Sequence, residues 1–85
     1  MKKTVKVIKK IFLKSDFAKG QSIKKIDEAE NLFDYGMDSI SFVSFLVALE
    51  NMFNITFEIE ELDYENLNTL NKIAEACEKK TGAEE

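Results

Sequence analysis

One short segment of this 85-residue chain, Gly36-Met37-Asp38-Ser39-Ile40, combines residue types that could anchor a covalent group. Gly36 lets the backbone turn sharply, and Asp38 is a good N-cap for a helix that begins at Ser39. The Ser39 hydroxyl would then lie in the first helical turn, beside backbone N–H groups without an intrahelical partner. Because a helix N-terminus favours negative charge, an ester between this serine and a phosphate would be well placed. Taken alone, Asp-Ser before a helix is more typical of a plain cap or of an exposed first-turn residue.

The helix that starts at Ser39 is predicted to run over residues 39–53 and is apolar nearly all round, with Glu50 as its only charge. Such a helix lies in the middle of a core, or its outward face meets partners. Phe53 is placed on the inner face, so its truncation to alanine is expected to lose about 3–5 kcal/mol. The predicted partner-binding surface comprises the residues around the serine and on the outward face, with neutral surface positions as the alternative: Met37, Ile40, Ser41, Ser44, Val47 and Asn51.

Two further helices follow from apolar residues at helical spacing. Residues 4–14 carry Val5, Ile8, Ile11 and Phe12 with lysines between them. A last helix is capped by Asn68 or Thr69, and its predicted buried positions fall at i, i+3, i+4 and i+7: Leu70, Ile73, Ala74 and Cys77.

The two connections are less regular. Residues 15–36 form a long connection with at most a short helical turn around 23–30, and such long connections are often functional. After the central helix, Ile55, Phe57 and Ile59 alternate with polar residues, which predicts an extended link anchored to the core, followed by one or two turns over 60–66. The chain is therefore predicted to be an all-α bundle of three main helices and one short helix. It forms a single domain over 1–85, with a core at about 4–80 and an acidic tail at 81–85.

Composition limits the chemistry that the chain can perform. It has no histidine and one cysteine, which removes His-containing triads, a disulfide framework and a cysteine-rich zinc site. Ser39 lacks a Gly-x-Ser-x-Gly context, Cys77 lies on an apolar stripe, and the order of Asp34, Gly36 and Asp38 does not fit an EF-hand. We therefore expect no catalytic residue and no metal. No apolar run is long enough to cross a membrane, and no signal peptide is visible, so a cytoplasmic protein is expected.

Charge is distributed unevenly along the chain. Residues 1–25 carry nine lysines and one acid, whereas the remainder carries three lysines and fifteen acids. A basic arm is compatible with nucleic acid or an anionic membrane. Without arginine or interleaved aromatics, however, Lys2, Lys6, Lys9 and Lys10 fit better as the solvated face of a helix, so neither nucleic-acid binding nor membrane insertion is expected.

The full order of these features resembles the acyl and peptidyl carrier protein family. Gly36-Met37-Asp38-Ser39-Ile40 is similar to the family's Gly-x-Asp-Ser-Leu motif, with Ile40 for Leu. Val43, Leu46, Ala48-Leu49-Glu50 and Phe53 also fall where the family's second helix has Val, Val, Ala-Leu-Glu and Phe.

This resemblance implies the function. Ser39 would receive 4′-phosphopantetheine from coenzyme A, with Asp38 and Gly36 shaping the site, and the thiol of that arm would hold a substrate as a thioester. The chain itself would be no enzyme. Its partners would be a phosphopantetheinyl transferase, an acyl- or aminoacyl-loading enzyme and a downstream synthase or transferase. It would act as a discrete monomer in a fatty-acid, polyketide or non-ribosomal-peptide type pathway.

Two departures from the family pattern bear on the cargo. The second helix lacks the acids typical of carriers in bacterial fatty-acid synthesis, so partner recognition is expected to be more apolar and less sensitive to salt. The segment Asn68-Thr69-Leu70-Asn71-Lys72-Ile73 resembles the Asp-Thr-Pro-Asn-Lys-Ile of D-alanyl carrier proteins. Both features favour aminoacyl, peptidyl or polyketide-type cargo over fatty acids. The alternative is an unmodified helical interaction module of carrier-like fold.

Overall fold

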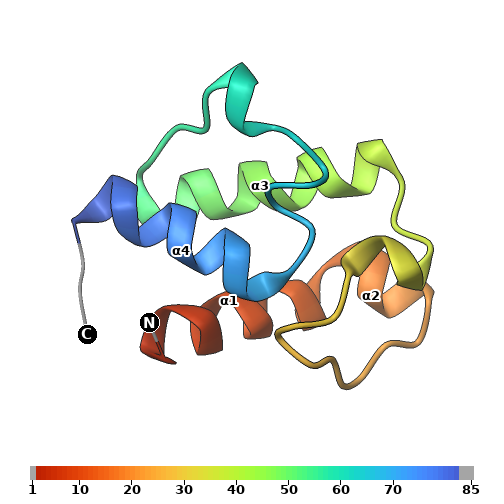
Figure 1. Ribbon diagram of the computed structural model, residues 1–85. Coiled ribbons are helices and arrows are strands. Elements are labelled where there is room, and N and C mark those ends of the chain that lie inside the picture. Colours follow the sequence, from red (N-terminus) through yellow and green to blue (C-terminus); the bar gives the residue numbers. More distant parts are fainter. Residues whose placement is uncertain (1, 83–85) are drawn as a thin grey trace.

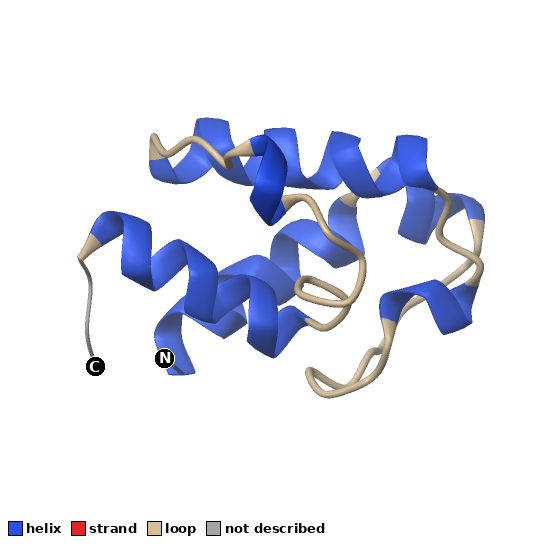
Figure 2. Ribbon diagram, turned by 45° about the horizontal axis from the view of Figure 1, so that its top comes forward, coloured by secondary structure: helices blue, strands red, loops and turns tan. Residues whose placement is uncertain are grey.

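The computed structural model describes residues 2–82, and within that range it contains helices and no strands (Figures 1 and 2). Three long helices and one short helix form the α-helical bundle predicted from the sequence. In chain order the elements, with the two 3₁₀ helices written η, are α1 (Lys2–Lys14), α2 (Asp16–Gly20), η1 (Leu32–Tyr35), α3 (Ser39–Phe53), η2 (Ile59–Glu61) and α4 (Leu70–Thr81).

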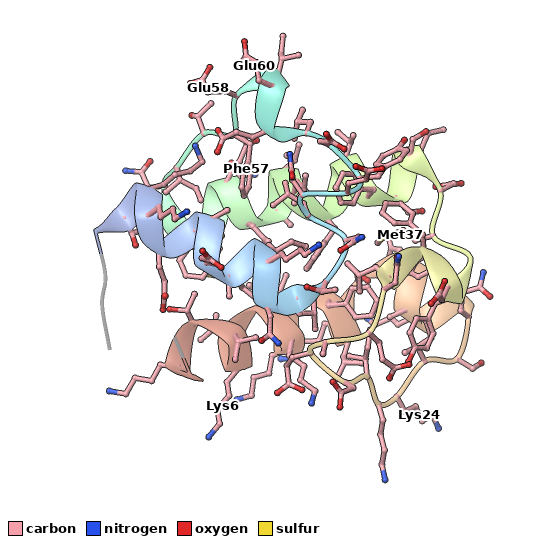
Figure 3. The ribbon with its side chains drawn as sticks, viewed as in Figure 1. Lys6, Lys24, Met37, Phe57, Glu58 and Glu60 are labelled. Atoms are coloured by element: carbon pink, nitrogen blue, oxygen red, sulfur yellow. The ribbon has the colours of Figure 1, made fainter. Side chains whose placement is uncertain are left out.

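Helix α1 joins the bundle through one apolar face and contacts α4, α2 and α3. Val5, Ile8 and Phe12 recur at helical spacing and are buried. Lys6 projects into solvent (Figure 3) and Lys10 is exposed, as predicted, whereas the side chain of Lys2 lies outside the described part. Lys9 is only partly exposed and forms an ion pair with Glu28 at 3.4 Å, so its prediction as a solvated residue is wrong. Amphipathicity therefore explains both the position of α1 and its basic outer face.

Helix α3 has the predicted ends because both are capped. Asp38 caps the first turn, and Asn54 ends the helix in the left-handed conformation, which asparagine tolerates. Its inner face buries Phe42, Phe45, Leu46 and Leu49. Phe53 packs against the core from the inner face, as predicted, but it is only partly buried in the last turn of the helix, so the expected loss for its truncation is too large.

The first connection contains a helix that the sequence analysis did not predict. Ser15 caps α2 by accepting a hydrogen bond from the Ala18 N–H at 3.2 Å, and Ala18 is buried. The turn expected around 23–30 is not helical; helix forms instead at α2 and η1. The connection is thus folded at both ends and irregular in the middle.

The second connection is anchored to the core at Phe57, as predicted, and Ile55 packs partly against it. Ile59 is 85% exposed, so the prediction that it also anchors the link is wrong. Glu58 and Glu61 form a reciprocal capping box that curls the chain into η2 and turns Ile59 outward. The remainder of the expected 60–66 helix is irregular at 62–63 and a turn at 64–66.

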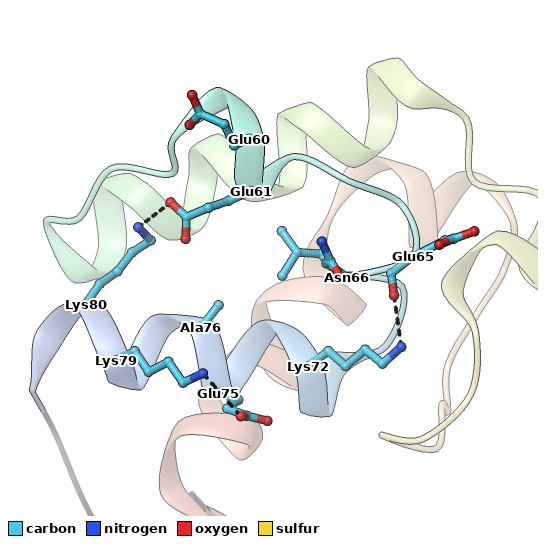
Figure 4. A pocket seen from close by; sticks show the side chains of 10 residues that line it. Glu60, Glu61, Glu65, Asn66, Lys72, Glu75, Ala76, Lys79 and Lys80 are labelled. Carbon is cyan, nitrogen blue, oxygen red and sulfur yellow. Dashed lines mark hydrogen bonds and ion pairs between the residues drawn. The ribbon is translucent and has the colours of Figure 1, made fainter.

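Side-chain contacts hold this connection against the helices. A Glu50 carboxylate oxygen on α3 accepts a hydrogen bond from the Phe57 N–H at 2.7 Å. On the other side, Lys80 of α4 forms an ion pair with Glu61 (Figure 4) and lies over the Phe57 ring. The connection is therefore fixed to both α3 and α4.

Helix α4 closes the core as predicted. Thr69 is the N-cap, accepting a hydrogen bond from the Lys72 N–H at 3.1 Å, and Leu70, Ile73, Ala74 and Cys77 are buried. Gly82 ends the helix in the left-handed conformation. Residues 83–85 of the predicted acidic tail lie outside the described residues. Within 2–82, none of the helices has the length and apolarity needed to span a bilayer.

Candidate functional site

The loop before Ser39 rests on an aromatic cluster. The ring of Phe33, on η1, lies 5.2 Å from the ring of Phe42 on α3 and 4.7 Å from that of Tyr64. Asn31 caps η1 by accepting from the Phe33 N–H, and the Leu32 N–H donates to the Asn68 carbonyl at 2.7 Å. These contacts fix η1 against α3 and the start of α4, so the entrance to α3 is rigidly placed.

Gly36 makes the turn between η1 and α3. Its φ of +87° lies in the left-handed region, where a side chain is strained, and its N–H donates to the Phe33 carbonyl. A Cβ added here would meet no atom within 4 Å, so the need for glycine comes from the backbone angle and not from crowding.

We expect Gly36→Ala to lose about 1–2 kcal/mol of unfolding free energy through this backbone strain. Chemical denaturation of the variant and the parent measures this loss of unfolding free energy. Gly20→Ala is the matched control, because Gly20 has equally open space and no positive φ. Equal losses in the two variants would contradict the strain argument.

Asp38 and Ser39 have the geometry that the sequence predicted. An oxygen of the Asp38 carboxylate accepts a hydrogen bond from the Ser41 N–H at 2.8 Å, and Ser39 is exposed as the first residue of α3. The hydrogen bond from the Ser41 N–H, reinforced by the Ser41 hydroxyl, lowers the pKa of Asp38. The N–H groups of Ser39 and Ile40 have no partner within the helix and point out of its end.

The lowered pKa of Asp38 predicts a pH dependence. The carboxylate stabilises α3 fully above the ordinary aspartate pKa of about 3.9, and this contribution is lost as the pH falls through the lowered value. We expect the parent to lose more stability than Asp38→Asn between pH 5 and pH 2, and thermal unfolding of both proteins at each pH measures the difference. Parallel curves for the two proteins would show that the cap is not linked to protonation.

The predicted partner-binding residues separate into two groups. Ile40, Ser44, Val47 and Asn51 are exposed on α3 and Ser41 is partly exposed, so these side chains are accessible. Met37 is only 5% exposed and belongs to the core (Figure 3). Its prediction as an outer residue is wrong, because the left-handed turn at Gly36 directs the next side chain inward, among the buried residues.

The outer face of α3 carries no charged side chain. Glu50 is the one charge of the helix, and its carboxylate is bound to the Phe57 N–H. Ile40 is 77% exposed, and Val43 and Val47 are also exposed. The outer face of α3 beyond Ser39 is therefore uncharged, with exposed aliphatic side chains among polar ones.

The other candidate groups have structural surroundings. Cys77 is buried on α4, and desolvation raises the pKa of its thiol to about 11, which keeps it protonated at neutral pH. Asp34 and Asp38 are not brought into a metal site: among residues 2–82 there is no group of three or more Cys, Asp or Glu side chains that could hold an ion.

Comparison with known protein families identifies the class of protein. The family model described as "Phosphopantetheine attachment site" matches residues 20–77, which run from the end of α2 through η1, α3 and η2 into α4. The chain belongs to this family of phosphopantetheine-binding carrier proteins. The group that the family carries is 4′-phosphopantetheine, attached covalently.

Curated relatives are D-alanyl carrier proteins. The chain is similar to that of Streptococcus mutans, with 40% identity over 68 residues, which cover 67% of this chain and 86% of the relative. It is 45% identical over 51 residues to that of Streptococcus uberis, covering 59% of this chain. There the match spans 65% of the relative's length. No solved structure matches.

The site fits the family's prosthetic group. Ser39 is exposed, the space in front of Gly36 is open, and the first N–H groups of α3 are available to a phosphate oxygen. Asp38 is negatively charged, but its carboxylate is directed to the Ser41 N–H. A phosphodiester on the Ser39 oxygen therefore meets donors at this helix end.

Proposed function

We propose that Ser39 is the attachment residue and that Asp38 and Gly36 shape its site. The observation that carries this proposal is the exposed Ser39 hydroxyl at the capped N-terminus of α3, inside the region that the family model matches. The attached 4′-phosphopantetheine supplies a thiol on which cargo is held as a thioester. The chain itself holds and presents that cargo and contributes no catalytic residue.

We further propose that the cargo is an aminoacyl group of the D-alanyl class. The similarity to D-alanyl carrier proteins supports this, and so does the start of α4, where the Asn68–Ile73 segment resembles theirs. The uncharged outer face of α3 points the same way, because it lacks the acids expected of a fatty-acid carrier.

The proposed partner surface is the outer face of α3: Ile40, Ser41, Ser44, Val47 and Asn51. Its partners are a phosphopantetheinyl transferase, a loading enzyme and a downstream transferase. Because this surface carries no charged side chain, we expect their binding to change little with salt. We propose that residues 1–85 act as one monomeric carrier domain with a core at about 4–80, in the cytoplasm.

D-alanine loading tests the cargo. The modified chain is incubated with ATP, D-alanine and the enzyme that loads D-alanine onto the Streptococcus mutans carrier, and its intact mass is measured. We expect a gain of one alanyl residue with D-alanine and little with L-alanine. The Streptococcus mutans carrier is the positive control. Failure to load beside an active control would contradict the D-alanyl assignment, while leaving attachment of the arm intact.

A further inference from the structure

A groove lies between α3 and the helices that precede it. The α3 side is formed by Ser41, Ser44 and Ala48, and the opposite wall by Ile11 of α1 and Phe17 of α2. Its volume is about 510 Å³, within the range of about 300–1,000 Å³ that is usual for small-molecule pockets. We call this hollow the α1–α3 groove.

The groove opens beside the proposed attachment residue. Ile40, which directly follows Ser39, and Ser41 both contribute to its lining. A flexible arm tethered at Ser39 would therefore be held at high effective concentration next to this hollow. Because the arm is part of the molecule once attached, it meets the groove before any free ligand does.

The chemistry of the lining suits a neutral chain of amides and methyl groups. Ile11, Phe17 and the buried Phe45 supply apolar surface, and the exposed Ser44 hydroxyl can donate to or accept from an amide. Lys14 and Asp16 are the charged residues of the lining, and their charges are opposite. The groove as a whole does not repel an arm whose phosphodiester end is anionic.

Two other hollows near α3 and α4 fit this arm less well. The groove on the other side of α3, lined by Val43, Ile59 and Tyr64, has two carboxylates, Glu60 and Asp63, and no cation. These acids repel a phosphodiester. Another hollow lies between η2 and α4, where charged side chains of its own lining are already paired, as with Lys80 and Glu61 or Lys79 and Glu75 (Figure 4).

We propose that the α1–α3 groove is the resting site of the phosphopantetheine arm, which lies along Ser44 and Ala48 against Ile11 and Phe17. This inference rests on the proposed attachment at Ser39. It gives α2 a role, because without that helix Phe17 would not form the outer wall.

Backbone amide shifts of the unmodified and the coenzyme A-modified protein test the proposal, with the arm kept reduced and the mass checked first. We expect shifts at Ile11, Lys14 and Phe17, which are remote from Ser39 in sequence. A mass gain with shifts confined to the Ser39 turn, or with shifts at Val43, Ile59 and Tyr64, overturns the groove assignment alone. Absence of a mass gain overturns attachment at Ser39 and the groove assignment with it.

A variant whose groove is filled by a larger side chain provides a second test. Ala48→Leu places a larger side chain in the groove. We expect this variant to be modified with phosphopantetheine, but without the changes in amide shift at Ile11 and Phe17. Val43→Leu is the matched control on the opposite side of α3, and it should keep those shifts. If Ala48→Leu keeps them as well, the arm does not occupy the groove.

Discussion

Replacing Phe12 by alanine should remove about 3–5 kcal/mol of unfolding free energy, a large share of the total for a small domain. Phe12 is fully buried on α1, and its ring meets the ring of Phe45 of α3 edge-on at 5.5 Å and that of Phe17 at 6.2 Å. Truncation therefore leaves a cavity where α1, α2 and α3 meet. The expected fall in melting temperature exceeds about 12 °C.

Phe53→Ala is the matched control for this prediction. Phe53 is an equal side chain that is only partly buried at the end of α3, so less apolar surface and a smaller cavity are involved. We expect a clearly smaller loss, measured by denaturant unfolding of both variants. An equal or larger loss for Phe53→Ala would contradict the packing described for these two helices.

Ser39→Ala should abolish attachment of the prosthetic group and leave the fold intact. The hydroxyl is the proposed acceptor, so its removal leaves no oxygen for the phosphodiester. Its loss costs little stability, because Ser39 is exposed and the cap of α3 is made by Asp38. Intact mass after treatment with a transferase, together with a melting curve, measures both effects.

Thr56→Ala is the control for Ser39→Ala, since it removes an exposed hydroxyl that lies outside the proposed partner surface. We expect it to be modified at the same stoichiometry as the parent. Modification of Ser39→Ala would place the attachment elsewhere, and an unfolded Ser39→Ala would show that the hydroxyl is structural.

Where local signals agreed, the sequence predicted the fold well. For α3, a capping aspartate and an apolar run over residues 39–53 indicate the same limits, and the structure has those limits. The last helix was predictable for the same reason, through Thr69 and its apolar stripe. Asp38 and Ser39 could be placed because their positions depend on the helix cap alone.

Where the direction of a side chain depended on the conformation of a turn, the sequence alone did not predict whether it faces the core or the solvent. Met37 faces inward because of the left-handed backbone at Gly36, and Ile59 faces outward because a capping box curls the chain. Helix α2 is five residues long, too short for a periodic pattern. Ser15 and Asp16 were its available signal, as a cap followed by an acid in the first turn.

Mass spectrometry of the intact chain tests the central claim most directly. The parent is incubated with coenzyme A and a broad-specificity phosphopantetheinyl transferase, beside a carrier protein that proves the enzyme active. The account predicts a gain of one phosphopantetheinyl unit, located by peptide fragmentation on Ser39. An unchanged mass beside a modified control would contradict it and favour an unmodified interaction module that uses the apolar face of α3.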